Sequence, residues 1–181
     1  MIVCAGKTEQ FDFAHPIGVG LIESAMNLTR LCLFDKPEFL LFIGSAGSFG
    51  EYQPFDIVQS RGAAQIELSF LDKHSYTPIE NVITSEGLNV SHETLINSSN
   101  YITTSKKYWS TMQKLGIGAE NMEFFSLMQV AKEFAIPAGG IFIITNFCDE
   151  DAHKAYQNNY KKAMLKLEEY IRSRFFEKKH S

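Results

Sequence analysis

The stretch Phe39-Leu40-Leu41-Phe42-Ile43, followed directly by Gly44-Ser45-Ala46-Gly47-Ser48, decides the fold class. Five consecutive apolar residues are typical of a strand that is buried on both faces, as in a parallel sheet covered by helices. A second run of this kind, Gly140 to Thr145, stands near the other end of the chain. Segments with helical periodicity accompany both runs, and such alternation indicates a doubly wound α/β fold.

Other apolar patterns add strands and helices to these two runs. Strands are expected at Met1–Ala5, Asp56–Ser60, Ala64–Phe70 and Asn81–Ser85, and helices at Gly18–Asp35, Lys106–Leu115, Glu120–Phe134 and Glu150–Lys179. Together they predict a three-layer αβα sandwich around a mixed, mostly parallel central sheet. No repeat, low-complexity run or long Pro/Gly/Ser linker divides the chain, so we expect one domain over residues 1–181.

The composition favours a small-molecule ligand over a nucleic acid or a membrane. The 181 residues carry a net charge of −4, whereas a phosphate backbone binds clustered Lys and Arg. Lys7, Glu9 and Asp12 interrupt the apolar N-terminus, which therefore matches neither a signal peptide nor a membrane span. The three cysteines have neither disulfide-like nor zinc-like spacing, so we expect reduced thiols and a cytoplasmic location.

The small residues Gly44 to Ser48 follow the first buried run. Ligands of doubly wound sheets collect beyond the carboxyl ends of the strands, and small residues there let backbone amides approach a phosphate or a sugar hydroxyl. A tight turn built from small residues explains the same pattern equally well.

Glu123 and Asn146 are candidates for contact with a polar ligand. Glu123 stands beside Met122, Phe124 and Phe125, where a carboxylate needs a partner such as a pair of vicinal hydroxyls. The alternative is an acidic residue favoured by the dipole of a helix. Asn146 follows the second buried run and offers two donors and one acceptor, or else simply ends the strand or caps the next helix.

Four neighbouring polar residues, Asp149, Glu150, Asp151 and His153, raise the question of a metal site. Contiguous carboxylates that lead into a helix are more often solvated charges at its N-terminus. We therefore expect no metal and no cofactor.

Several segments, in this order, resemble the superfamily of purine nucleoside phosphorylases and nucleosidases. Pro16–Ala25 is similar to its G-I-G-x-x-x-A-A segment, Phe42–Gly47 to T-G-S-A-G, Phe55–Val58 to G-D-I-V, and Asn121–Glu123 to V-E-M-E. Asn146 falls where the family has its base-binding Asp or Asn. The resemblance spans roughly Ile17 to Tyr156 and includes nucleosidases that act on methylthioadenosine and futalosine.

The resemblance implies cleavage of the bond between a purine base and ribose, with phosphate or water as the second substrate. It implies catalytic roles for Glu123 and Asn146, and substrate-binding roles for Ser45, Gly47, Tyr101, Ile102, Met122 and Arg61. Arg61 is the nearest cation that could replace the family's phosphate-binding Arg, and Glu9 is the residue that could replace the carboxylate with which family hydrolases activate water.

The Ile-Thr-Asn sequence ending at Asn146 resembles that of phosphorylases of 6-oxopurines, whereas hydrolases of the family usually have Asp there. This resemblance implies phosphorolysis of nucleosides such as inosine and guanosine, within purine salvage and catabolism. Hydrolysis by water and a nucleoside-binding protein without catalysis are the alternatives. A homodimer or larger homo-oligomer is also expected, because family members commonly complete the pocket with an aromatic residue of a neighbour.

Overall fold

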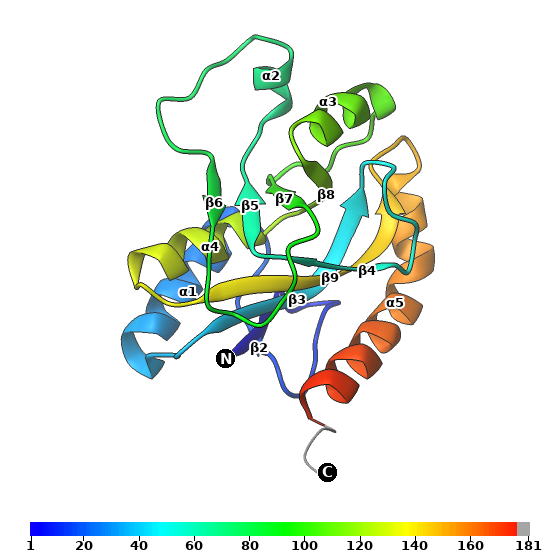
Figure 1. Ribbon diagram of the computed structural model, residues 1–181. Helices are drawn as coiled ribbons and strands as arrows, with labels where there is room; N and C mark the ends of the chain where they lie inside the picture. The colour runs from blue at the N-terminus through cyan, green and yellow to red at the C-terminus, as the bar shows by residue number, and fades with distance from the viewer. Residues whose placement is uncertain (177–181) are drawn as a thin grey trace.

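The computed structural model describes residues 1–176 (Figure 1). The strands are β1 (Ile2–Cys4), β2 (His15–Pro16), β3 (Leu40–Ser48), β4 (Ile57–Ser60), β5 (Gly62–Ala64), β6 (Val82–Thr84), β7 (Leu95–Ser98), β8 (Ile117–Asn121) and β9 (Ala138–Phe147). The helices are α1 (Leu21–Asp35), α2 (Leu68–Leu71), α3 (Trp109–Lys114), α4 (Phe124–Glu133) and α5 (Ala152–Phe175), with a 3₁₀ turn at Lys106–Tyr108.

The long strand β3 is the centre of the sheet. β9 runs parallel to it from Leu40 to Ser48, while β1 pairs with its beginning and β8 with its end. The pairs β1–β2, β1–β3, β3–β9, β5–β7 and β7–β8 are parallel, and β3–β8, β4–β9 and β5–β6 are antiparallel. The prediction of a mixed, mostly parallel sheet is confirmed.

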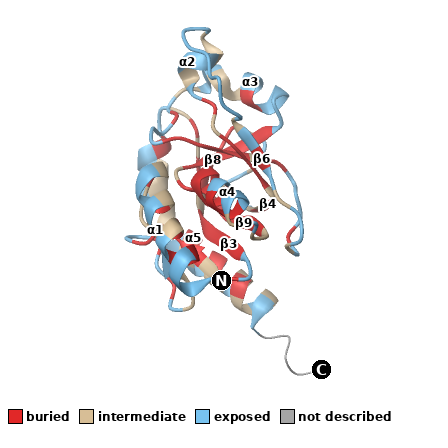
Figure 2. Ribbon diagram, turned by 90° about the vertical axis from the view of Figure 1, so that its left-hand side faces the viewer, coloured by how far each residue is buried: buried red, intermediate tan, exposed pale blue. Residues whose placement is uncertain are grey.

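Helices cover both faces of this sheet (Figure 1). Leu40 and Phe42 pack in the cluster that contains residues of α1 and α4, whereas Leu41 and Ile43 pack in the cluster that contains residues of α5. Successive side chains of a strand point to opposite faces, so a continuous apolar run is what a strand between two helical layers needs. Buried residues accordingly run through β3, β8, β9 and α4 in Figure 2.

The small residues after Ile43 continue the strand and do not form a turn. β3 extends to Ser48, with a shift of register between Ala46 and Gly47. Their small size makes room for neighbouring side chains, because a Cβ at Gly44 would lie 2.6 Å from Oε2 of Glu9. The alternative interpretation of Gly44–Ser48 as a tight turn is therefore wrong.

The expected strand Ala64–Phe70 is wrong beyond its first residue. β5 ends at Ala64. The backbone N–H of Ile66 donates to Asn97 Oδ1 and its carbonyl accepts from Asn97 Nδ2, so neither group is left to pair with a neighbouring strand. One turn of helix, α2, follows at Leu68–Leu71.

The strands β2, β7 and β8 were not predicted. β8 ends with Glu120 and Asn121, which we had assigned to the start of a helix. Both residues are buried at the end of the strand, and α4 begins only at Phe124, after Asn121 Oδ1 has accepted from the backbone N–H groups of Glu123 and Phe124. The expected helical start at Glu120 is therefore wrong, whereas Glu123 does stand at the N-terminus of α4.

The last helix, expected at Glu150–Lys179, runs over Ala152–Phe175 as α5, and residues 177–179 lie outside the described part. Ala163, Leu167 and Ile171 share one face of this helix at intervals of four residues, and all three are buried. No helix within residues 1–176 is long and apolar enough to cross a bilayer. A single domain over all 181 residues stays a prediction.

Candidate active site

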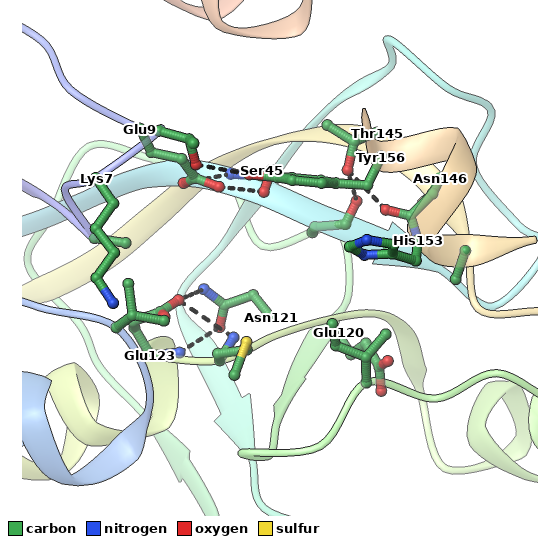
Figure 3. Close-up of a pocket in the computed structure, with 18 of the residues that line it drawn as sticks. Lys7, Glu9, Ser45, Glu120, Asn121, Glu123, Thr145, Asn146, His153 and Tyr156 are labelled. Carbon is green, nitrogen blue, oxygen red and sulfur yellow. Dashed lines mark hydrogen bonds between the residues drawn. The ribbon is translucent and has the colours of Figure 1, made fainter. Parts of the chain in front are cut away.

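A cavity of about 340 Å³ lies where the carboxyl ends of β3 and β9 meet the loop after β1 and the start of α5. This volume is in the range of sites for small molecules. Its lining comes from segments far apart in the chain: Ala5, Gly6, Lys7, Thr8, Glu9, Val19, Ser45, Ala46, Gly47, Tyr101, Ile102, Glu120, Asn121, Met122, Glu123, Thr145, Asn146, Ala152, His153 and Tyr156. In Figure 3, Glu9 and Glu123 lie toward one end of the cavity, and Asn146 and Glu120 toward the other.

Glu9 is buried against β3. The backbone N–H of Ser45 donates to its Oε2 at 3.0 Å, and the Ser45 hydroxyl donates to its Oε1. Burial raises the pKa of Glu9, and the hydrogen bonds from Ser45 act in the opposite direction. A carboxylate with a raised pKa at the wall of a cavity is suited to accept a proton from a bound molecule.

Glu123 stands at the N-terminus of α4 with only 5% of its surface exposed. Gly20 N–H donates to Oε1 at 2.9 Å, and Asn121 Nδ2 and Met122 N–H donate to Oε2 at 2.9 and 3.2 Å. Burial raises the pKa of Glu123 to about 7, and the negative charge of Glu9 adds to this effect. Glu123 therefore changes its charge near neutral pH and keeps one acceptor position on Oε1 for a ligand.

The Asn146 amide is held by its neighbours in β9. Its Oδ1 accepts from the Thr145 hydroxyl at 2.8 Å, and its Nδ2 donates to the carbonyl of Phe147 at 2.9 Å. One N–H and one lone pair of the amide remain. Asn146 thus offers a ligand one donor and one acceptor in a fixed orientation, fewer than the free side chain offers.

All but one of the predicted site residues line this cavity: Ser45, Gly47, Tyr101, Ile102, Met122, Glu123 and Asn146. Arg61 does not, and its expected contribution to the site is corrected. Ser60 pairs with Gly140, six residues before Asn146 on β9, a separation of roughly 20 Å along the strand. The Arg61 guanidinium instead binds Glu86, with Nη1 2.8 Å from Oε2.

Sequence reasoning missed several polar residues that line the cavity, among them Lys7, Glu120, Thr145, His153 and Tyr156. For His153 and Tyr156 a signal existed, because the first turns of a helix that directly follows a central strand lie at the carboxyl end of that strand. Tyr156 also accepts or donates a hydrogen bond at 2.9 Å with the hydroxyl of Thr8. Among residues 1–176, no three His, Cys, Asp or Glu side chains are grouped as metal ligands.

A family model described as the phosphorylase superfamily matches residues 2–173. The chain belongs to this superfamily. The predicted resemblance to nucleoside phosphorylases and nucleosidases is thereby confirmed, and the chain is a member of a group of nucleoside-metabolising enzymes. Comparison with curated protein sequences gives no match.

Solved structures share the fold of this phosphorylase-superfamily chain. A 5′-methylthioadenosine/S-adenosylhomocysteine nucleosidase of Helicobacter pylori is 18% identical, with a TM-score of 0.78 and 95% of each chain covered. A futalosine hydrolase mutant of Helicobacter pylori is 19% identical, with a TM-score of 0.79 over 95% of this chain and 96% of the other. A 5′-methylthioadenosine/S-adenosylhomocysteine nucleosidase of Neisseria meningitidis is 15% identical, with a TM-score of 0.76 over 94% of this chain and 95% of the other.

Proposed function

We propose that this protein cleaves the N-glycosidic bond of purine nucleosides with water as the nucleophile. The observation that carries the proposal is the buried Glu9 carboxylate, held by Ser45 at the wall of the cavity. The fold shared with two kinds of hydrolytic nucleosidase supports the same reading. The preference for phosphorolysis drawn from the sequence is reversed in this proposal.

The surroundings of Ser45 favour water over phosphate. The Ser45 N–H, which the sequence suggested as a phosphate donor, already donates to Glu9. A phosphate bound beside Ser45 would stand against the Glu9 carboxylate, and two like charges in a buried site repel each other strongly. Arg61, the cation expected to offset that repulsion, lies outside the cavity.

In the proposed reaction, Glu9 takes a proton from water while the water oxygen bonds to C1′ of the ribose and the bond from C1′ to the base breaks. Charge builds up on both fragments in a transition state of oxocarbenium character. Glu123 accepts a hydrogen bond from a ribose hydroxyl, and Met122 packs against the sugar. The Asn146 N–H stabilises the negative charge on the departing base, which takes its proton from solvent.

The base is proposed to lie between Tyr101 and Ile102 and the sheet, with 6-oxopurines preferred. Tyr101 is 80% exposed and Ile102 54% exposed, although both line the cavity. Exposed apolar residues at the edge of a site suit contact with another protein surface. We therefore propose a homodimer or larger homo-oligomer in which a neighbouring subunit covers this edge. The cytoplasmic location expected from the cysteine pattern is also kept as a proposal.

The deciding experiment incubates the purified protein with inosine, guanosine, adenosine and 5′-methylthioadenosine, with and without phosphate. Release of free base and ribose without phosphate is expected, and in ¹⁸O-labelled water the ribose should carry the label. Formation of ribose 1-phosphate that depends on added phosphate would overturn the choice of water. Binding of nucleosides without any cleavage would instead indicate a binding protein.

A further inference from the structure

The first turns of α5 form one wall of the cavity, beside the carboxyl end of β9. His153 and Tyr156 line the cavity, and Asn159 follows at the same spacing of three residues, so the three side chains share one face of the helix. Asn159 Nδ2 donates to the carbonyl of Thr145 at 2.8 Å, which fixes this face of α5 against β9. The imidazole of His153 consequently lies at the same end of the cavity as Asn146 (Figure 3).

The departing base needs a proton that Asn146 cannot supply. As the bond between C1′ and the base breaks, its electron pair moves onto the purine. The Asn146 amide can donate a hydrogen bond to this charge, but an amide is too weak an acid to transfer the proton. A positioned acid that protonates a leaving group accelerates the reaction by about 10²–10⁴-fold, and His is the side chain that most often does so.

The three carboxylates of the cavity do not suit this role. Glu9 and Glu123 lie toward the opposite end, where the proposed reaction already uses them. Glu120 lies at the end of Asn146, but only 7% of its surface is exposed, and its two oxygens accept from the backbone N–H and the hydroxyl of Thr103, each at 2.8 Å. Burial raises the pKa of Glu120, whereas these hydrogen bonds favour its ionised form, which has no proton to give.

Two other side chains of the lining can carry a proton, and neither is placed or tuned to deliver it to the base. The Tyr156 hydroxyl shares a hydrogen bond of 2.9 Å with the Thr8 hydroxyl, and burial raises the pKa of Tyr156, which makes it a weaker acid. Lys7 is directed toward the end that holds Glu123 (Figure 3). His153 is exposed, so it can take up a proton from solvent after each turnover.

We propose that His153 transfers a proton from solvent to the departing base. This inference rests on the proposed function, because it takes the cavity to hold a purine nucleoside. The water oxygen bonds to C1′ and its proton passes to Glu9, while the electron pair of the breaking bond moves onto the base and a ring N–H of protonated His153 gives its proton to N7. His153 then takes a proton from solvent and Glu9 returns one, so that one water is consumed for each ribose and base released.

The test compares two substrates in His153→Gln, whose side chain still donates a hydrogen bond but cannot transfer a proton. With inosine, kcat should fall by about 10²-fold or more. 7-Methylinosine already carries a positive charge on the ring that contains N7, so its base leaves without a proton, and kcat should stay within about threefold of the native value. Equal losses with both substrates, or no loss with inosine, would overturn the assignment.

The matched control is Lys154→Gln, which removes a cation from the same turn of α5. Lys154 is exposed and is not among the residues that line the cavity, so this variant should cleave both substrates at the native rate. Thermal melts followed by circular dichroism establish that both variants are folded. A loss with inosine in Lys154→Gln as large as in His153→Gln would indicate a general effect of charge and contradict the proposal.

A second probe replaces the base by a leaving group that needs no proton. The phenolate of 4-nitrophenyl β-D-ribofuranoside is stable near neutral pH, so His153→Gln should cleave this compound within about threefold of the native rate. Parallel losses with this compound and with inosine would assign His153 a general role in the site and overturn the proposal.

The native protein separates failure of this inference from failure of the proposed function. If it releases base from inosine without phosphate but His153→Gln slows all three substrates equally, only the role of His153 is overturned. If the native protein releases no base from any nucleoside, the proposed function fails, and the inference fails with it.

Discussion

The two ends of the cavity hold their buried carboxylates in different ways. Glu9 comes from the loop between β1 and β2, and its carboxylate is fixed by a single residue, Ser45. Glu120 is part of β8, so strand register sets its position, and the backbone N–H and hydroxyl of Thr103 donate to its two oxygens. A carboxylate on a loop can shift as a reaction proceeds, whereas one within a sheet offers fixed geometry. We therefore expect changes near Glu9 to affect turnover, and changes at the other end of the cavity, near Asn146, to affect the choice of base.

The largest expected effect is that of Glu9→Gln. An amide still accepts from Ser45 through its oxygen, but it cannot take a proton from water, so kcat should fall by about 10²–10⁴-fold. Steady-state kinetics on the best nucleoside measure the loss. Thr8→Val, which removes the neighbouring hydrogen bond to Tyr156 and keeps Glu9, is the control and should lose far less activity. Near-native turnover by Glu9→Gln would exclude Glu9 as the base.

Glu123→Gln should reduce kcat/KM by about 10²–10³-fold, because the amide loses an acceptor for the ribose. In the native protein, kcat/KM should rise with pH through about 7, where Glu123 becomes ionised, since only the ionised form accepts freely. A pH profile from 5 to 9 tests this. An unchanged efficiency in the variant would reduce Glu123 to a residue at the end of a helix.

Asn146→Asp should change base preference with a smaller effect on the best substrate. A protonated carboxyl can donate to N7 while its other oxygen accepts from the 6-amino group of adenine. The inosine over adenosine ratio should therefore narrow by about 10- to 100-fold. If adenosine is already the better substrate of the native protein, or if the variant leaves the ratio of kcat/KM for inosine over adenosine unchanged, Asn146 does not determine base specificity.

The stability of the native protein should also depend on Glu123. Its pKa in the folded state, about 7, lies above the usual 4.5, so the folded protein keeps this proton at pH values where the unfolded chain has lost it. Its contribution is therefore fully present below about pH 4.5 and is lost as the pH rises to about 7, a difference of about 3 kcal/mol. Urea unfolding at pH 5 and pH 8 should show a smaller decrease in the free energy of unfolding for Glu123→Gln than for the native protein. An equal decrease in both proteins would contradict this origin.

The smallest effect is expected for Arg61→Ala. Arg61 lies outside the cavity in an ion pair with Glu86, whose side chain is 88% exposed, and such pairs contribute about 0–1 kcal/mol. Turnover should stay within about threefold of the native value, with or without phosphate. A large loss of activity that depends on phosphate would return Arg61 to the site and favour phosphorolysis.

Local patterns predicted the fold class because buried strands and helices show as apolar runs and as hydrophobic periodicity in the sequence. The apolar runs ending at Ile43 and at Thr145 became β3 and β9, and the buried face of α5 matched its helical period. β8 shows no such pattern, because only Ile117 in it is strongly apolar, although all five of its residues, Ile117–Asn121, are buried. Its burial depends on partners that lie elsewhere in the chain.

The sequence by itself determined the α/β architecture, the superfamily and the candidates Glu123 and Asn146, since each follows from nearest-neighbour patterns or from the order of short segments. Only the tertiary structure decided that Glu9 and Glu120 belong to the cavity and that Arg61 does not. The physical reason is distance along the chain. Glu9 contacts Ser45 across 36 residues of sequence, and Glu120 and Asn146 lie on either side of Gly47 only because of the register of three strands. Strand register depends on the hydrogen bonds and the burial that all strands of the sheet achieve together. No short stretch of the sequence contains that information.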